Sequence, residues 1–302
     1  MTKETLLISG ANGLVAKQFA QLYGKNYNIR FLTRTKRNEN EYAWDIEKGK
    51  IDPEALVGVD HIIHLAGANI AEKRWTNQRK QILRSSRIDA IQLLCRELLE
   101  AKITLKSFVS ASAIGYYGSQ TTDDIYHETD APAGDFLATL CVDWEQAADQ
   151  IKELGIAKKV VKLRLGVVLS HDAKLIQTLQ TQAKWGLASA IGSGKQYIPW
   201  IHIDDLCHML NHVVKTTDTH GVYNAVAPEH TTNKELTQKI AKALSRPMFM
   251  PNVPAFVLRL VLGESAIIAL EGSRVSSKKI SDTGFPFRYP TVVSALEEVL
   301  WV

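Results

Sequence analysis

The feature that most constrains this 302-residue chain is the segment LLISGANGLVA at residues 6–16. Its apolar run predicts a buried parallel strand, and Gly10 and Gly13 predict a tight turn directly after that strand. An amphipathic helix is expected over 15–23. A strand, a glycine turn and a helix start in this order are typical of the place where an α/β sheet binds a pyrophosphate.

Each small residue of this turn has a physical reason to be there. Gly10 permits the tight turn, Gly13 has no Cβ and lets a phosphate approach the backbone, and Ala16 lets the helix pack close to the sheet. The free N–H groups of the first helical turn would then meet the anion. An ordinary strand-to-helix turn is the alternative, and the position of the motif directly after the first strand favours the nucleotide site.

Strands and helices alternate after this turn, which predicts an α/β fold with a Rossmann-type doubly wound parallel sheet. We expect further strands at 28–33, 59–66, 105–110, 160–169, 198–203 and 222–225, and helices at 78–101, 143–154, 175–184 and 234–244. The pattern loosens after about Ser170. We therefore expect a nucleotide-binding domain over 1–168 and a smaller C-terminal α/β lobe over 169–302, with some strand material of the second part returning to the main sheet.

Composition narrows the functional class. Apolar residues make up 45% of the chain and charged residues 23%, as in soluble globular proteins. The net charge is +4 without a long basic run, so neither a nucleic acid nor a membrane is needed as a partner. Cys95, Cys141 and Cys207 are widely spaced and indicate neither a metal site nor a disulfide framework. Lys3 and Glu4 precede the first apolar run, so we expect a cytoplasmic protein without a signal peptide; its oligomeric state stays open.

The end of the second expected strand indicates which dinucleotide binds. An NAD site usually has an Asp or Glu here to hold the ribose hydroxyls, but this chain reads Thr33-Arg34-Thr35-Lys36-Arg37 and has no acid before Glu39. Cations suit a 2′-phosphate, which predicts NADP, and a charge-assisted hydrogen bond from Arg34 would be worth about 1.5–3 kcal/mol. A solvated basic loop is the alternative.

Hydroxyl groups are expected at the same edge of the sheet. The segment SASAIGYYG at 110–118 closes a predicted strand and carries Ser112, Tyr116 and Tyr117. Ligands of open α/β sheets bind at the carboxyl ends of the strands. These three residues are therefore the catalytic candidates.

Taken together, these motifs resemble the extended short-chain dehydrogenase/reductase superfamily of nucleotide-sugar epimerases and dehydratases, over nearly the whole chain. More narrowly, the chain resembles the branch usually called epimerase family protein, an atypical, NAD-dependent epimerase/dehydratase-like branch. The elements that carry the resemblance are Gly10, Gly13 and Ala16, the segments 65–67, 74–76, 86–87, 111–118, 192–194 and 200–206, and the piece at 262–265.

The resemblance implies NADP as the cofactor and contacts at matching positions. The pyrophosphate would be held by Gly10, Asn12, Gly13 and Leu14, and the 2′-phosphate by Thr33 and Arg34. The adenosine ribose and the nicotinamide side of the cofactor would lie near Leu65, Ala66 and Gly67. Arg87 would reach a cofactor phosphate, and Val167 would border the nicotinamide. For Arg87 the alternative is an ordinary surface charge on a helix.

One departure from the superfamily pattern concerns catalysis. The superfamily moves a proton with a Tyr-x-x-x-Lys pair about 25 residues after the serine that corresponds to Ser112. In this chain that register falls on Leu137 and Cys141, and a shift by one residue gives Phe136 and Leu140. None of these side chains offers a phenol or an amine, so the usual relay is missing.

Two functions from different classes remain. The first is an NADP(H)-dependent oxidoreductase or epimerase-like enzyme that acts on an unidentified small-molecule substrate; the second is an NADP(H)-binding sensor or regulatory protein with little turnover. In the enzyme, Tyr117 or Tyr116 would act as a proton donor, although stacking or packing is an equal alternative for both. Glu128, Asp135 and His202 are weaker candidates for a base, because loop acids are usually solvated and a buried histidine is usually structural.

Overall fold

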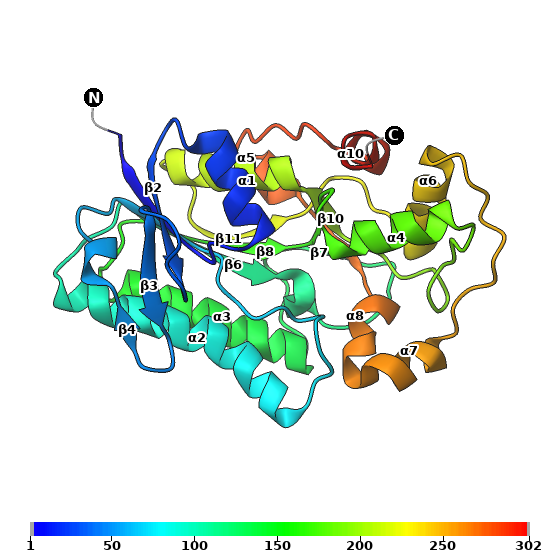
Figure 1. Ribbon diagram of the computed structural model, residues 1–302, viewed down its shortest axis with the longest axis horizontal. Helices are drawn as coiled ribbons and strands as arrows, with labels where there is room; N and C mark the ends of the chain where they lie inside the picture. The colour runs from blue at the N-terminus through cyan, green and yellow to red at the C-terminus, as the bar shows by residue number, and fades with distance from the viewer. Residues whose placement is uncertain (1–2, 301–302) are drawn as a thin grey trace.

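A computed structural model describes residues 3–300 and confirms the α/β class, with a Rossmann-type sheet covered by helices on both faces (Figure 1). Eight strands follow the order β11-β8-β6-β5-β1-β2-β3-β4. Their bounds are Thr5–Ser9 for β1, Asn28–Thr33 for β2, Glu41–Asp45 for β3, Lys50–Ile51 for β4, His61–His64 for β5, Ser107–Ala113 for β6, Val160–Leu165 for β8 and Gly221–Ala225 for β11. Neighbours pair in parallel except β3 and β4, which pair antiparallel.

The strands read as apolar runs because both faces of the sheet are buried. Along β1, Leu6 and Ile8 join the cluster under α1 (Leu14–Tyr23) and α5 (Ile203–Lys215), while Leu7 joins the cluster under α2 (Asn77–Glu100) and α3 (Phe136–Glu153). All three side chains are completely buried. Figure 1 shows α1 and α5 on one face of the sheet and α2 and α3 on the other.

The strand order reverses between β1 and β5. The chain moves outward from β1 to β2 and β3 and then crosses to the opposite side of β1, where β5, β6, β8 and β11 follow. In open parallel sheets such a reversal leaves a crevice at the carboxyl ends of the strands, and ligands bind there.

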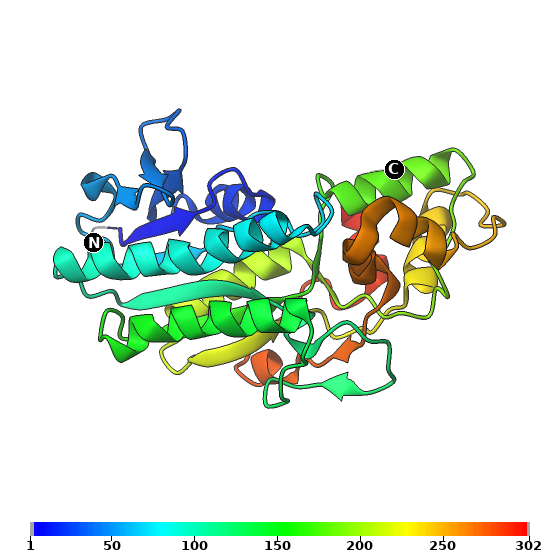
Figure 2. The same cartoon turned by 90° about the horizontal axis from the view of Figure 1, so that it is seen from below.

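The smaller lobe lies at one end of the molecule (Figure 2). Its core is formed by side chains of α4 (Lys174–Lys184), α6 (Asn233–Ala243) and α10 (Val292–Val299), which pack together. Two short parallel sheets connect the lobes, β9 (Val167–Leu169) with β10 (Trp200–His202) and β7 (Ile125–Tyr126) with β12 (Arg274–Val275). The remaining elements are η1 (Pro53–Ala55), η2 (Ile114–Tyr117), α7 (Ala255–Leu262), η3 (Gly263–Ala266), α8 (Ile267–Leu270) and α9 (Lys278–Ser281).

Most predicted elements have bounds that differ from the structure by one to three residues. Three of the differences have a local reason. The helix predicted from 143 begins at Phe136, because the Asp135 carboxylate caps it by accepting the N–H of Ala138 at 2.9 Å. The strand predicted over 160–169 breaks at Gly166, where a Cβ would lie 2.6 Å from the Pro199 carbonyl oxygen. The strand predicted to end at 203 stops at His202, because His202 caps α5.

The division of the chain at residue 168 stays a prediction. Two elements from beyond that boundary complete the larger layer: β11 extends the main sheet beside β8, and α5 packs against α1. Hydrogen bonds fasten the two helices, from Gln18 Nε2 to Asp204 Oδ1 at 2.6 Å and between Tyr23 Oη and His208 Nδ1 at 2.6 Å.

Candidate functional site

The glycine turn lies at the reversal point of the sheet. Gly10 has a φ of +84°, and a Cβ there would lie 3.1 Å from the carbonyl carbon and oxygen of Leu65. Directly before it, the Ser9 hydroxyl oxygen accepts the N–H groups of Leu65 at 3.1 Å and Ala66 at 3.2 Å. The carboxyl ends of β1 and β5 are thus held together with no room for a side chain between them.

The first turn of α1 follows the glycine turn directly. The helix begins at Leu14, its N-cap Gly13 provides no side-chain hydrogen bond, and no acidic residue lies in its first turn. Asn12 and Gly13 are both exposed. The positive end of the helix dipole therefore lies beside exposed residues and has no carboxylate within the first turn to neutralise it, which favours an anion at this position.

The end of β2 leads into a loop with three exposed cations, Arg34, Lys36 and Arg37. Thr33 is buried and its hydroxyl bonds the backbone of Thr35, while Arg34 is exposed. Arg34 makes no ion pair within residues 3–300, whereas the Lys36 ammonium lies 5.5 Å from the centre of the Tyr42 ring. A guanidinium in this position is suited to a phosphate.

Arg87 lies beneath the loop that follows β5. The alternative, an ordinary surface charge on a helix, is wrong because this side chain is buried. Only 9% exposed, its guanidinium donates to the carbonyl oxygens of Leu83 at 2.9 Å and Ala68 at 3.1 Å. A Cβ on Gly67 would lie 3.1 Å from Arg87 Cζ, and the Trp144 ring lies on its other side at 4.9 Å. Burial lowers the pKa of Arg87 to about 10. In the described part of the chain no carboxylate pairs with this buried cation, which is unusual for a buried charge.

The remaining predicted cofactor contacts lie along the seam between the lobes. Val167 begins β9, is half-buried and donates its N–H to the Pro199 carbonyl oxygen at 2.8 Å. Leu14, in the first turn of α1, packs against the same apolar cluster as Val167. The start of α1 and the start of β9 therefore adjoin.

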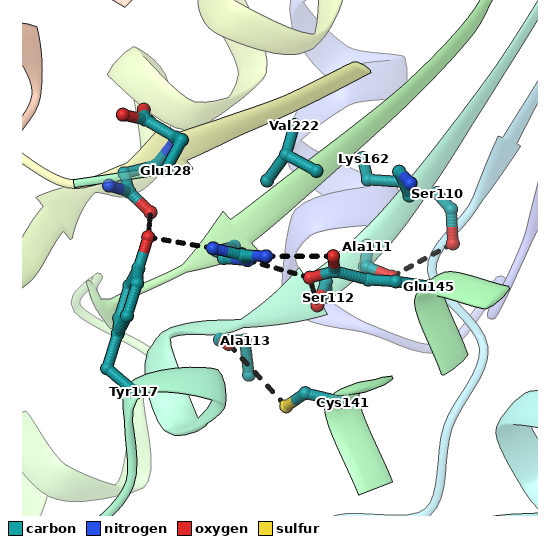
Figure 3. Close-up of polar contacts among 12 residues, drawn as sticks. Ser110, Ala111, Ser112, Ala113, Tyr117, Glu128, Cys141, Glu145, Lys162 and Val222 are labelled. Carbon is teal, nitrogen blue, oxygen red and sulfur yellow. Dashed lines mark hydrogen bonds and ion pairs between the residues drawn. The ribbon is translucent and has the colours of Figure 1, made fainter. Parts of the chain in front are cut away.

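Ser112 belongs to a buried polar network (Figure 3). Its hydroxyl donates to Glu145 Oε1 at 2.7 Å. Arg164 donates to the same carboxylate, from Nε to Oε1 at 2.8 Å and from Nη2 to Oε2 at 3.0 Å. All three residues are under 9% exposed. Burial lowers the pKa of Arg164, but the hydrogen bonds and charge of Glu145 outweigh that effect, so the pKa lies above its ordinary value.

Tyr117 extends this network to β11. Its hydroxyl accepts from Arg164 Nη1 at 2.9 Å and donates to Asn224 Oδ1 at 2.7 Å, and the side chain is 3% exposed. Burial raises the pKa of this phenol to about 12. Glu128 is also engaged, because Oε1 accepts the backbone N–H of Asn224 at 2.8 Å (Figure 3).

Tyr116 differs from Tyr117 in its surroundings. The Arg164 guanidinium carbon lies 3.3 Å from the centre of the Tyr116 ring, so the cation stacks on the face of the ring. Tyr116 is half-buried, and its hydroxyl has no hydrogen-bond partner within residues 3–300. Of the two neighbouring phenols, Tyr117 already donates its hydroxyl proton to Asn224, whereas Tyr116 donates to no residue of the described chain.

The positions of the absent relay are filled by packing. A Cβ on Gly115 of η2 would lie 3.3 Å from Leu137 Cβ and 3.8 Å from Cys141 Sγ, so both side chains press on η2. The Cys141 thiol donates to the Ala113 carbonyl oxygen at 3.5 Å, and burial raises its pKa to about 12. A thiol in this environment cannot replace the missing lysine as a cation.

Asp135 and His202, the other candidates for a base, both cap helices. Asp135 also accepts the N–H of Ser119 at 2.7 Å, and His202 Nδ1 accepts the N–H of Asp204 at 3.1 Å. Burial lowers the pKa of His202. Their hydrogen bonds give each a structural role.

Sequence reasoning missed Glu145, Arg164 and Asn224 as members of the network. Two of them carry a weak signal, because Arg164 is a charge inside the apolar run of β8 and Glu145 lies on the buried side of α3. A charge in such a position needs a partner. Their pairing joins different elements, and no spacing in the sequence predicts it.

Comparison with known proteins places the chain in a family. Residues 6–226 match the model of the NAD dependent epimerase/dehydratase family, and residues 253–299 match a domain of unknown function, DUF1731. The chain belongs to the NAD dependent epimerase/dehydratase family.

Relatives and solved structures agree with this assignment. The chain is 34% identical to Epimerase family protein Mb2239 of Mycobacterium bovis over 98% of this chain and 97% of that one. The structure of human epimerase family protein SDR39U1 (isoform 2) with NADPH superposes with a TM-score of 0.86 at 30% identity, covering 98% of both chains. MoeE5 in complex with UDP-glucose and NAD shares the fold, with a TM-score of 0.79 at 18% identity and 98% of both chains covered.

The buried pair predicts a large effect on stability. Glu145→Ala leaves the Arg164 guanidinium buried without its carboxylate, so we expect the free energy of unfolding to fall by about 3–5 kcal/mol. Guanidinium denaturation measures this difference. The matched control is Asp282→Ala, which breaks the exposed Lys278–Asp282 pair and should change stability by under about 1 kcal/mol. Equal effects of the two variants would contradict the structural role of the network.

Proposed function

We propose that this protein is an NADP(H)-dependent oxidoreductase or epimerase-like enzyme for a small substrate that carries a hydroxyl or carbonyl group. The observation that carries the proposal is the uncapped first turn of α1 at the reversal point of the sheet. There, a side chain at Gly10 or Gly13 would crowd the neighbouring backbone, and the N-cap of α1 provides no side-chain hydrogen bond. A pyrophosphate fits this turn, together with Asn12 and Leu14.

Two cations support a phosphate-rich cofactor. Arg34, next to Thr33, would bind the 2′-phosphate that distinguishes NADP from NAD. Arg87 is a buried cation without a carboxylate, under the loop of Leu65, Ala66 and Gly67, and would gain a counter-charge from a cofactor phosphate. The NADPH in the human relative of 30% identity agrees with both assignments.

When bound, the cofactor supplies or accepts a hydride; the residues of this chain would orient the substrate and move a proton. Val167, at the seam of the lobes, would border the nicotinamide. Ser112 would polarise the substrate oxygen by turning its hydroxyl proton from Glu145 Oε1 to the substrate. We rank Tyr116 before Tyr117 as the proton donor, because the Tyr117 hydroxyl is already committed to Arg164 and Asn224.

The cofactor assignment predicts a preference between dinucleotides. NADPH should bind at least tenfold more tightly than NADH, a difference of about 1.4 kcal/mol, as measured by calorimetry. Arg34→Ala should remove most of this preference, because NADPH loses its charge-assisted bond and NADH loses none. Arg37→Ala, on the same exposed loop, is the control and should retain the preference. Equal affinities of the native protein for the two cofactors would exclude the 2′-phosphate site.

Turnover separates the enzyme from a second candidate. Because Leu137 and Cys141 fill the relay positions, a sensor that binds NADP(H) without turnover is the alternative. A screen of NADPH oxidation over diverse carbonyl compounds decides between them. We expect Ser112→Ala and Tyr116→Phe to reduce the rate by roughly 10²–10⁴ while NADPH affinity stays within twofold to threefold of native, about 0.5 kcal/mol.

Each other outcome of the screen has a defined meaning. Turnover that neither variant changes would refute the proposed proton path. Absence of turnover on every carbonyl compound, with tight NADPH binding intact, would favour the sensor.

A further inference from the structure

Two segments of the smaller lobe contain no acidic residue. Residues 173–203 and 236–263 together carry seven Lys or Arg and no Asp or Glu, although the whole chain has a net charge of only +4. The rest of the chain therefore has a net charge of −3. The modest total, from which we expected no membrane partner, conceals an uneven distribution of acids along the sequence.

The two acid-free segments lie side by side. Val253 donates its N–H to the Ala190 carbonyl oxygen at 2.8 Å, and Gly192 donates to the Val253 carbonyl oxygen at 2.8 Å. The α4 helix of one segment packs against α6, part of which belongs to the other.

Figures 1 and 2 show α4, α6 and α7 together at the end of the molecule away from β3 and β4. Lys239 is paired with Glu229 at 2.6 Å, whereas Lys184, Arg246 and Arg259 are exposed and make no ion pair within residues 3–300. Exposed cations without a paired carboxylate therefore lie at this end of the molecule.

The same segments carry the most exposed apolar side chains of residues 3–300. Five large apolar side chains are 61–77% exposed, and all five lie here: Trp185, Phe249, Phe256, Leu260 and Val261. The α7 helix has no buried residue although seven of its eight residues are apolar. Basic residues adjoin the apolar ones in sequence: Lys184 precedes Trp185, and Arg259 precedes Leu260. We call these five side chains, with Lys184, Arg246 and Arg259, the apolar-basic surface.

We infer that the apolar-basic surface docks the protein onto a bilayer that contains anionic lipid. Exposed Trp, Phe and Leu side chains enter the boundary between headgroups and acyl chains, where apolar area is buried without the protein crossing the bilayer. Lys and Arg beside them attract anionic headgroups. No helix in the described part of the chain is long and apolar enough to span a membrane, so the contact lies at the membrane surface.

Charge favours a bilayer over two other occupants. A second copy docked through the same surface would bring Lys184, Arg246 and Arg259 of both copies toward one another, and these like charges repel in a two-fold contact. A nucleic acid would satisfy the cations but has no contact to offer the aliphatic side chains of Leu260 and Val261 in α7. An anionic bilayer satisfies both kinds of side chain at once.

Sedimentation with lipid vesicles tests the inference on the full-length protein. Vesicles of phosphatidylcholine with added phosphatidylglycerol should bind the protein, vesicles of phosphatidylcholine alone should bind it far less, and salt should weaken the binding. The apolar variant Trp185→Ser/Phe256→Ser and the charge variant Lys184→Glu/Arg246→Glu should each reduce binding at least about tenfold.

Matched controls lie elsewhere on the molecule. Val57→Ser/Leu154→Ser removes two apolar side chains that are 55% and 52% exposed, and Lys25→Glu/Lys158→Glu reverses two exposed charges. Both should bind the anionic vesicles as the native protein does. Thermal unfolding of all four variants verifies that their folds are intact.

Five results would overturn the inference. The first three are no binding of the native protein to anionic vesicles at low salt, native-like binding by the apolar variant, and equal losses in the controls. The fourth is light scattering that shows a native dimer lost in the apolar variant while vesicle binding persists, which would make the surface a contact between two copies. Binding to duplex DNA that depends on Lys184 and Arg246 but not on Trp185, without vesicle binding, would identify a nucleic-acid surface.

Discussion

The close approach of β1 and β5 at Gly10 is the constraint on which the candidate site depends. Ser9 binds the backbone after β5, and a side chain at Gly10 would collide with Leu65. This contact holds the carboxyl ends of two adjacent strands at the reversal point of the sheet, with the first turn of α1 directly above. The first turn of α1 can thus present its backbone N–H groups to an anion because no side chain intervenes.

A second constraint separates this chain from enzymes with a Tyr-x-x-x-Lys relay. Glu145 and Arg164 form a buried pair that holds the Ser112 hydroxyl and the Tyr117 phenol, while Leu137 and Cys141 pack against η2. The hydrogen bonds of this network therefore hold β6, α3 and β8 together, whatever part they have in chemistry. Such a network fixes the position of Ser112 but leaves few groups free to move a proton.

The sequence predicts local features well and distant pairings poorly. The glycine turn and the parallel sheet follow from residues that are neighbours in the chain, and the structure confirms the sheet. The start of α3 was missed because its first turns, Phe136–Leu140, carry no polar face to reveal a helix. The partnership of Ser112 with Glu145 and Arg164 joins β6, α3 and β8, and it becomes visible only once the fold brings these elements together.

The distribution of charge is a second feature whose meaning depends on contacts between distant segments. The absence of acids from 173–203 and 236–263 is plain in the sequence, but its consequence depends on the two segments lying side by side. The net charge of the whole chain averages this asymmetry away.

The central claim is that the glycine turn at the end of β1 holds the cofactor pyrophosphate. The most direct test is calorimetric titration of NADPH into the native protein and into Gly13→Val, with circular dichroism to verify the fold. Because the added branched side chain would occupy the space that the phosphate must enter, the variant should lose at least about 100-fold in affinity, roughly 2.7 kcal/mol. A folded variant that binds NADPH as tightly as the native protein would contradict the account.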